Sequence, residues 1–337
     1  MRKIVALFGA VAALTLLVAP VGAQQQPIVI KFSHVVAADT PKGKGVLKFK
    51  ELAEKYTNGK VRIEVYPNSS LFKDKEEMEA LQLGAVQMLA PSLSKFAPLG
   101  VKEFEALDLP WLFKDEATYS EAMKGEVGKW LFKKLETKGI SGLAYWDNGL
   151  KSFSSNRKMV VPEDLKGLKM RIQSSKVLEA QMRALGAIPQ VMAFSEVYQA
   201  LQTGVVDGTE NPHSNLYSQK MNEVQKFVTI TDHGYVGYAV VTNKKFWDGL
   251  PADIRAQLTQ AMADATKFTN DQAKKDNDDA LAKVKATGKT EVLTLTPAQK
   301  LPWKRALVKV HKEMEPRVGS EILQLVYKET GFDPAKL

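Results

Sequence analysis

The hydrophobic pattern of the first third of the chain predicts alternating strands and helices. Three segments have the apolar or alternating pattern of strands, at 28–33, 61–65 and 85–90. Between the first two, Thr40 can cap a helix with Pro41 in its first turn, and Asn58-Gly59 ends it. A second helix is expected over 74–83. This β-α-β-α-β order predicts a largely parallel sheet, with ligands bound at the carboxyl ends of its strands.

The same pattern restarts in the middle of the chain. Strands are expected at 140–146, 168–173, 190–192 and 205–206, with helices at 175–185 and 195–202. Two such units predict two sheets and one cleft. Strands at 227–230 and 237–242 are expected to cross between the units, and 251–285 reads as one long charged helix. A last helical stretch begins with a capping box at Thr296 and runs to about Thr330, with a break near Pro316.

The N-terminus has the pattern of an export signal. Arg2 and Lys3 precede an uncharged run over 4–23, which ends in the small residues Val21-Gly22-Ala23. A transmembrane anchor is the alternative, because the run approaches the ~20 apolar residues that span a bilayer. The glutamines that follow at 24–26 favour cleavage. We therefore expect a signal peptide at 1–23 and an exported, periplasmic protein.

Composition and charge exclude several classes of function. The chain has no cysteine, which rules out thiol nucleophiles, disulfides and a lipoprotein anchor. Without the two basic residues of the leader, 45 basic and 38 acidic residues leave a net charge of +7. The lysines alternate with acids along helices and are not gathered among aromatic side chains, so no nucleic-acid partner is expected. A positive balance is compatible with a small anionic ligand.

Motifs of enzymes, metal sites and cofactor sites are not found in the sequence. The chain lacks a phosphate-binding P-loop, a zinc-protease H-E-x-x-H, a nucleophile elbow and an EF-hand loop. None of its four histidines stands at i, i+4 spacing to another metal ligand. We predict a binding protein that is not an enzyme and that uses neither a cofactor nor a metal.

Two polar residues stand at predicted strand ends, where a ligand in the cleft would lie. Arg171 lies within the apolar strand at 168–173, where its planar fork can hold one carboxylate through two bonds. The alternative is an arginine facing solvent from a half-exposed strand. Asn211 precedes Pro212 at a predicted helix start, where it can donate to an anion or cap the helix. Spacing alone leaves these alternatives open.

A long gap-free block resembles the signature of TRAP transporter solute-binding proteins. The resemblance rests on Pro162–Arg171, Met192–Gly208, Glu210–Pro212, Phe32–His34, Tyr66–Leu71 and Asp108–Pro110. It extends over essentially the whole mature chain and is greatest for the C4-dicarboxylate-binding class. The family implies two α/β lobes with a ligand cleft between them, strands that cross between the lobes and a long helix that spans both. We expect lobe I to comprise 24–148 with 237–276, and lobe II to comprise 149–236 with 277–330.

The resemblance also implies roles for particular residues. In this family the arginine matching Arg171 pairs with the ligand carboxylate, the asparagine matching Asn211 donates to the same group, and the aromatic matching Phe194 packs on the ligand. Many members have a second basic residue, often arginine, where this chain has Lys151. The first-strand position matching His34 reaches into the cleft. Three further candidates by position are Lys42, Ser92 and Trp146.

The resemblance implies that the protein is a periplasmic receptor, which closes on its ligand and delivers it to a membrane permease. The permease of this family has two subunits and is driven by an ion gradient. We expect a C4-dicarboxylate such as succinate, malate or fumarate, held by Arg171, Asn211 and Lys151 at one end and by His34 and Lys42 at the other. The alternative ligands are a 2-oxo or hydroxy acid or a sugar acid, because the distal part of the site decides specificity. A secreted hydrolase and a sensor subunit are the alternatives from other classes.

Overall fold

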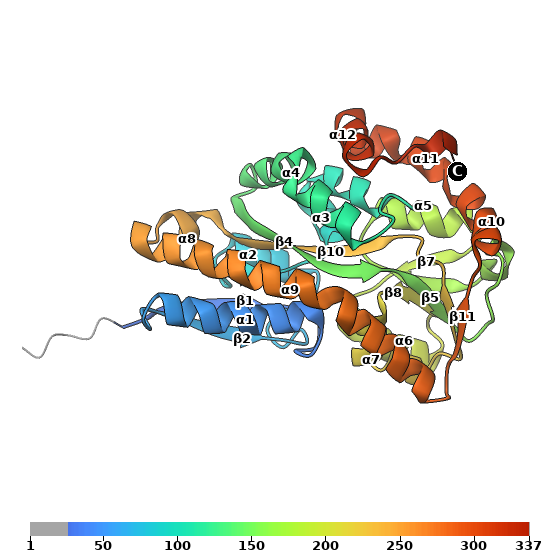
Figure 1. The fold of residues 1–337 in the computed structure, drawn as a ribbon, viewed down its shortest axis with the longest axis horizontal. Helices are drawn as coiled ribbons and strands as arrows, with labels where there is room; N and C mark the ends of the chain where they lie inside the picture. Colours follow the sequence, from blue (N-terminus) through green and yellow to red (C-terminus); the bar gives the residue numbers. More distant parts are fainter. Residues whose placement is uncertain (1–25, 337) are drawn as a thin grey trace, which may run out of the picture.

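The computed structural model describes residues 26–336 and contains two β-sheets (Figure 1). The first sheet has the order β2 (Val61–Tyr66), β1 (Ile28–Ser33), β3 (Met88–Leu89), β10 (Tyr235–Asn243) and β4 (Ile140–Leu150). Strands β1, β2 and β3 run parallel, and β10 is antiparallel to both β3 and β4. The parallel part of this sheet is the β-α-β-α-β run that the hydrophobic pattern predicts.

The second sheet lies beside the first. Its order is β11 (Glu291–Thr294), β9 (Phe227–Ile230), β5 (Ser152–Ser155), β8 (Gly208–Asn211), β6 (Lys169–Ile172) and β7 (Ile188–Val191). Strand β6 is parallel to β7 and β8, whereas β5 is antiparallel to β8 and β9. Only Lys151 separates β4 of the first sheet from β5 of the second, and four residues separate β9 from β10. The α/β prediction with two sheets joined by crossing strands is confirmed.

Helix α1 (Pro41–Tyr56) begins as its capping residues predict. The Thr40 hydroxyl accepts a hydrogen bond from the Gly43 amide at 3.1 Å, and Pro41 occupies the first turn. Val46 and Phe49 are fully buried on the helix face that packs against the first sheet. This packing fixes the start of α1, and with it Lys42, at the edge of the sheet where β1 ends.

The long helix α9 (Ala252–Ala286) contacts elements of both sheets (Figure 1). Its first half packs against α1 and β4, and its second half packs against α7 (His213–Ser218), which follows β8. The Lys44 ammonium lies 2.6 Å from the Asp276 carboxylate and joins α1 to α9. Each expected lobe boundary falls within or beside an element that is continuous here, β4, β10 or α9, and the lobe boundaries stay predictions.

The remaining helices cover the sheets. They are α2 (Glu76–Gln82), α3 (Glu116–Lys124), α4 (Glu126–Glu136), α5 (Lys176–Ala184), α6 (Val197–Thr203), α8 (Lys244–Asp248), α10 (Pro297–Leu307), α11 (Lys309–Val318) and α12 (Ser320–Thr330). Helix α11 packs on α5, and α12 packs on α3 and α4 (Figure 1). The helix break expected near Pro316 is found just after it, because α11 continues through Pro316 and ends at Val318. The chain turns at Gly319, whose φ of 98° favours glycine, and α12 follows.

Two expected strands are misplaced. The strand expected at 205–206 is found at Gly208–Asn211, and the one expected at 85–90 is reduced to Met88–Leu89. In both places an apolar pair follows a glycine with positive φ, Gly204 or Gly84, and completes the turn before the chain reaches the sheet.

Within the described residues no helix is long and apolar enough to cross a membrane. The expected signal peptide at 1–23 lies outside them.

The burial of His311 is expected to make the stability of the folded protein sensitive to acid. It is buried between the Pro110 carbonyl oxygen and the Tyr327 hydroxyl, and burial lowers its pKa from 6.5 to about 4, although the carbonyl opposes this shift. Between pH 6.5 and 4 the unfolded chain therefore binds more protons than the folded one at this position, so stability falls as pH falls. In His311→Gln the free energy of unfolding, measured by denaturant titration, should decline less steeply over this window. The difference is up to about 1.4 kcal/mol per pH unit. Equal slopes would contradict the assignment.

Candidate functional site

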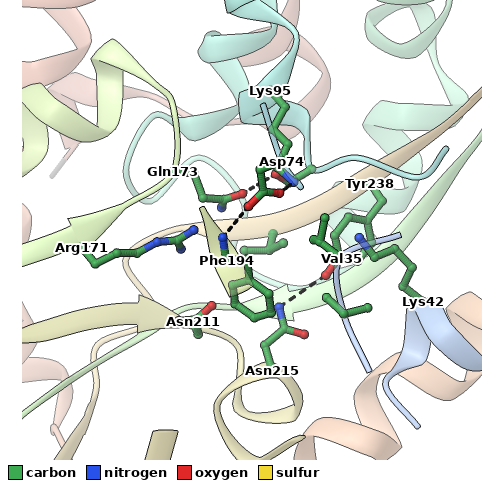
Figure 2. Close-up of a pocket in the computed structure, with 13 residues that line it drawn as sticks. Val35, Lys42, Asp74, Lys95, Arg171, Gln173, Phe194, Asn211, Asn215 and Tyr238 are labelled. Carbon is green, nitrogen blue, oxygen red and sulfur yellow. Dashed lines mark hydrogen bonds and ion pairs between the residues drawn. The ribbon is translucent and has the colours of Figure 1, made fainter. Parts of the chain in front are cut away.

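A cavity lies where the parallel strands of the two sheets end (Figure 2). It is lined by Val35, Val36, Lys42, Asp74, Ser92, Lys95, Arg171, Gln173, Phe194, Asn211, Asn215, Val236 and Tyr238. Several of these residues lie within or just beyond β1, β3, β6 and β8, which come from both sheets. The cavity is therefore at the carboxyl ends of parallel strands, as expected for α/β sheets. Five of the eight predicted site residues line it, namely Arg171, Asn211, Phe194, Lys42 and Ser92.

Arg171 brings a buried positive charge to the cavity from β6. Its side chain is 2% exposed, and its Nε and Nη2 donate to the Met192 carbonyl oxygen at 3.1 and 2.8 Å. The guanidinium lies 5.6 Å from the centre of the Phe194 ring. No carboxylate of the described chain forms an ion pair with it. Burial lowers the pKa of Arg171 to about 10, so it stays charged at neutral pH. The solvent-facing alternative for Arg171 is excluded.

Lys42 brings a second buried charge from the first turn of α1, on the opposite side of the cavity (Figure 2). Its ammonium donates to the Ala90 carbonyl oxygen at 2.9 Å and lies 3.9 Å from the centre of the Tyr238 ring. It too has no ion-pair partner within residues 26–336. Burial lowers the pKa of Lys42 to about 8, while Glu77 acts in the opposite direction. Most of the protein therefore carries this charge at pH 7.

A third buried cation, Lys95, has acidic partners and was not predicted from the sequence. Its ammonium pairs with Asp74 and lies 3.4 Å from Glu77. Asp74 also accepts a hydrogen bond from the Phe194 backbone amide, which joins the two sides of the cavity. Burial raises the pKa of Glu77 to about 8, although Lys42 opposes the shift. Of the basic residues that line the cavity in the described part of the chain, Arg171, Lys42 and Lys95, only Lys95 is paired with a carboxylate.

Polar groups complete the wall. Asn211 ends β8 and its Nδ2 donates to the Thr209 hydroxyl at 3.2 Å. The cap of α7 is Pro212, so Asn211 does not serve as that helix cap. The Ser92 hydroxyl donates to Gln173 Oε1, and this bond joins the segment after β3 to the segment after β6. Asn215, Gln173 and Tyr238 were missed by sequence reasoning, because a neutral polar side chain beside a strand has no distinctive pattern.

Three predicted site residues do not line the cavity. Lys151 is buried and its ammonium lies 2.8 Å from Glu210, whose other oxygen lies 2.7 Å from His233 Nε2. Trp146 stacks on Phe32 and donates to the Thr266 hydroxyl at 2.8 Å, within the core of the first sheet. His34 precedes the lining residue Val35, but its own ring is 1% exposed.

The electrostatic setting of His34 makes it a neutral group. Neither of its ring nitrogens has a hydrogen-bond partner in the described chain. Burial, with the charge of Lys42, lowers its pKa to about 3. A neutral imidazole can still donate one hydrogen bond to a ligand carboxylate, but it brings no charge to the site. Among residues 26–336, no three His, Cys, Asp or Glu side chains converge in the manner of a metal site.

The fold and this cavity define a class of protein, the bacterial extracellular solute-binding proteins. The chain belongs to family 7 of that class, whose model matches residues 32–317. It is 62% identical, over 98% of each chain, to the C4-dicarboxylate-binding periplasmic protein DctP of Rhodobacter capsulatus.

Solved structures show the same architecture. A TRAP periplasmic solute-binding protein from Shewanella oneidensis with bound succinate is 41% identical, and the match covers 90% of this chain and 99% of that one with a TM-score of 0.88. The sugar acid binding protein of Advenella mimigardefordensis in complex with galactonate is 30% identical, and the match covers 91% and 98% with a TM-score of 0.88. The same backbone therefore accompanies acids of different length.

Proposed function

We propose that this chain is a periplasmic receptor that binds a C4-dicarboxylate in the cavity and delivers it to the permease of a TRAP transporter. The observation that carries the proposal is the pair Arg171 and Lys42. Both are buried cations that line one cavity from opposite sides, and neither has a carboxylate partner in the described chain. Buried charges are costly unless they are paired, so a ligand with two carboxylates is the complementary occupant.

In this proposal Arg171 holds one carboxylate and Lys42 holds the other. Asn211 and Phe194 contact the end beside Arg171, since all three line the same side of the cavity. Lys151 acts indirectly, because its charge is neutralised by Glu210, the residue that precedes Asn211. His34 supports the wall as a neutral side chain. This assignment keeps the two-ended clamp of the sequence hypothesis but uses one cation at each end.

Ligand-driven closure follows from the same geometry. The two sides of the cavity are joined by Asp74 to the Phe194 amide, by Ser92 to Gln173, and by Lys73 to Glu196 at 3.0 Å. A ligand shifts a protein toward its closed form only by making contacts there that the open form lacks. A dianion that bridges Arg171 and Lys42 does this, because Arg171 lies in β6 of the second sheet and Lys42 lies in α1, which follows β1 of the first sheet. Release to the permease then requires the sides to separate.

The relatives support this ligand class and one alternative. The Rhodobacter relative is a C4-dicarboxylate-binding protein, and the Shewanella structure holds succinate. A sugar acid is the second candidate, since the more distant Advenella protein holds galactonate on the same fold. A monocarboxylate of this kind would use Arg171 and leave Lys42 without a partner, which makes the diacid the better match.

Calorimetry on refolded, ligand-free protein tests the proposal. We expect tight binding of succinate, malate and fumarate, and weak or no binding of pyruvate and gluconate, because the latter lack a second carboxylate for Lys42. Binding of a monocarboxylate with no response to the diacids would overturn the two-ended clamp and keep only the role of Arg171.

A further inference from the structure

A second, smaller chamber adjoins the cavity described above. It is lined by Ser92, Leu93, Ser94, Leu107, Asp108, Phe113, Tyr119, Gln173, Tyr235, Val236 and Gly237. Three of these residues, Ser92, Gln173 and Val236, also line the first cavity. The two spaces therefore share a wall, and we call the second one the rear chamber.

The shared wall consists of Val236 and one hydrogen-bonded pair of side chains. Ser92 follows β3 of the first sheet and Gln173 follows β6 of the second, and the Ser92 hydroxyl donates to Gln173 Oε1. Ser92 is 4% exposed, and Gln173 is half-buried. Adding or removing a few atoms at the wall of a binding site changes which ligands fit. A side-chain pair that separates two chambers therefore sets the length of ligand that the first chamber accepts.

The rear chamber has the chemistry of a hydroxyl-binding site. Asp108 is 4% exposed, and its Oδ1 accepts from the Ser94 hydroxyl at 2.8 Å. Its Oδ2 makes no hydrogen bond of good geometry in the described chain. Burial raises the pKa of this carboxyl to about 6, whereas the charge of Lys151 and the nearby Ser175 hydroxyl act in the opposite direction. A buried acceptor without a donor is costly, so a ligand hydroxyl there would gain a strong hydrogen bond. A second ligand carboxylate would instead meet the Asp108 charge.

We propose that the Ser92–Gln173 pair is a partition that restricts this receptor to short acids, and that the rear chamber behind it is a latent subsite for the hydroxyl-bearing end of a longer acid. The partition rests on the proposed function, since it divides the same ligand cavity. Arg171 would hold the carboxylate of such an acid on one side, and Asp108 would accept a hydrogen bond from a distal hydroxyl on the other.

The test opens the partition and measures the range of ligands. The variant Ser92→Gly/Gln173→Gly removes both side chains, whereas Ser92→Ala/Gln173→Met removes their hydrogen bond and keeps most of their bulk. Calorimetry would compare succinate, adipate and galactonate for wild type and both variants, with thermal unfolding as the check on folding. We expect galactonate to bind at least about tenfold more tightly to the opened variant than to wild type or the bulk-matched variant, a change of about 1.4 kcal/mol or more.

Two further comparisons sharpen the result. Adipate, which has six carbons like galactonate but ends in a second carboxylate, should gain little in the opened variant because it would face Asp108. Adding Asp108→Asn to the opened variant should remove most of the galactonate gain. Ser92→Gly alone, the mildest change, should give a smaller gain in the same direction and serves if the double variant does not fold.

The outcomes separate this proposal from the proposed function. A galactonate affinity that is equal in the opened and bulk-matched variants would overturn the partition, as would a gain for adipate as large as that for galactonate. Failure of wild type to bind any C4 diacid would overturn the proposed function instead. The comparison of the opened and bulk-matched variants on galactonate would still decide the partition in that case.

Discussion

Replacement of Arg171 by alanine is expected to abolish tight binding of succinate. The guanidinium is buried and is held by the Met192 carbonyl oxygen alone, with no carboxylate of the described chain as its partner. In the complex it would pair with a ligand carboxylate that burial deprives of water. Removal of one partner of a buried ion pair costs about 3–5 kcal/mol, roughly 150- to 5,000-fold in Kd. Calorimetry with succinate measures this loss.

Arg171→Lys is the matched control for this prediction. It keeps the charge but replaces a planar fork by a point charge, so we expect an affinity between those of wild type and Arg171→Ala. In the ligand-free protein Arg171 is a buried cation with no carboxylate partner, so its removal should not lower the thermal unfolding temperature. That measurement separates a binding defect from a folding defect. Near-wild-type succinate binding by Arg171→Ala would contradict its assignment to the ligand.

Local signals explain which parts of the fold were predictable. The apolar run of β1 and the Thr40 cap of α1 act within a few residues, and both elements have the predicted limits. Helix α9 was predicted almost to the residue for the same reason. Helices α3 and α4 were not predicted at all. Their contact with α12, two hundred residues away in the chain, leaves no local pattern. The Asp115 cap of α3 and the apolar face of α4 at Val127, Leu131 and Leu135 are local signals that the prediction did not use.

The candidate site was predictable to the extent that it rests on unusual residues. Arg171 in an apolar strand is such a signal, and the structure brings it to the cavity. Lys151 is an equally unusual basic residue beside a strand, but Glu210 neutralises it from β8, and sequence order does not reveal that partner. Lys95 and Asp74 lie 21 residues apart and pair only because β3 returns the chain beside α2.

The distribution of charge among the lysines decides which one receives the far carboxylate. Lys95 lies beside Asp74 and Glu77, so its charge is compensated before any ligand arrives. Within residues 26–336 the direct partners of Lys42 are a carbonyl oxygen and an aromatic ring, and Glu77 acts on its charge without forming an ion pair. A carboxylate that approaches Lys95 would also meet the charge of Asp74, whereas one that approaches Lys42 would not meet a paired acid. The far end of the ligand is therefore assigned to Lys42.

Lys42→Met is accordingly expected to lower the affinity for diacids and to leave the affinity for monoacids unchanged or improved. Loss of one partner of a buried charge pair costs about 2–5 kcal/mol, so succinate affinity should fall roughly 30- to 5,000-fold. Butyrate has the same four carbons and one carboxylate, so its weak affinity should stay the same or improve against the apolar methionine. Calorimetric titration of both acids measures this ratio, which a general packing defect would not change selectively.

Lys48→Met provides the control on the same helix, because Lys48 faces solvent beside Glu51 and does not line the cavity. It should leave both affinities within about twofold of wild type, since surface ion pairs contribute little. Parallel losses for succinate and butyrate in Lys42→Met would show that Lys42 only supports the wall. In that event Lys95, the other cation on the side of the first sheet, would become the candidate for the far carboxylate. Because Lys95 is paired with Asp74, succinate affinity would then have to be measured in variants of both residues.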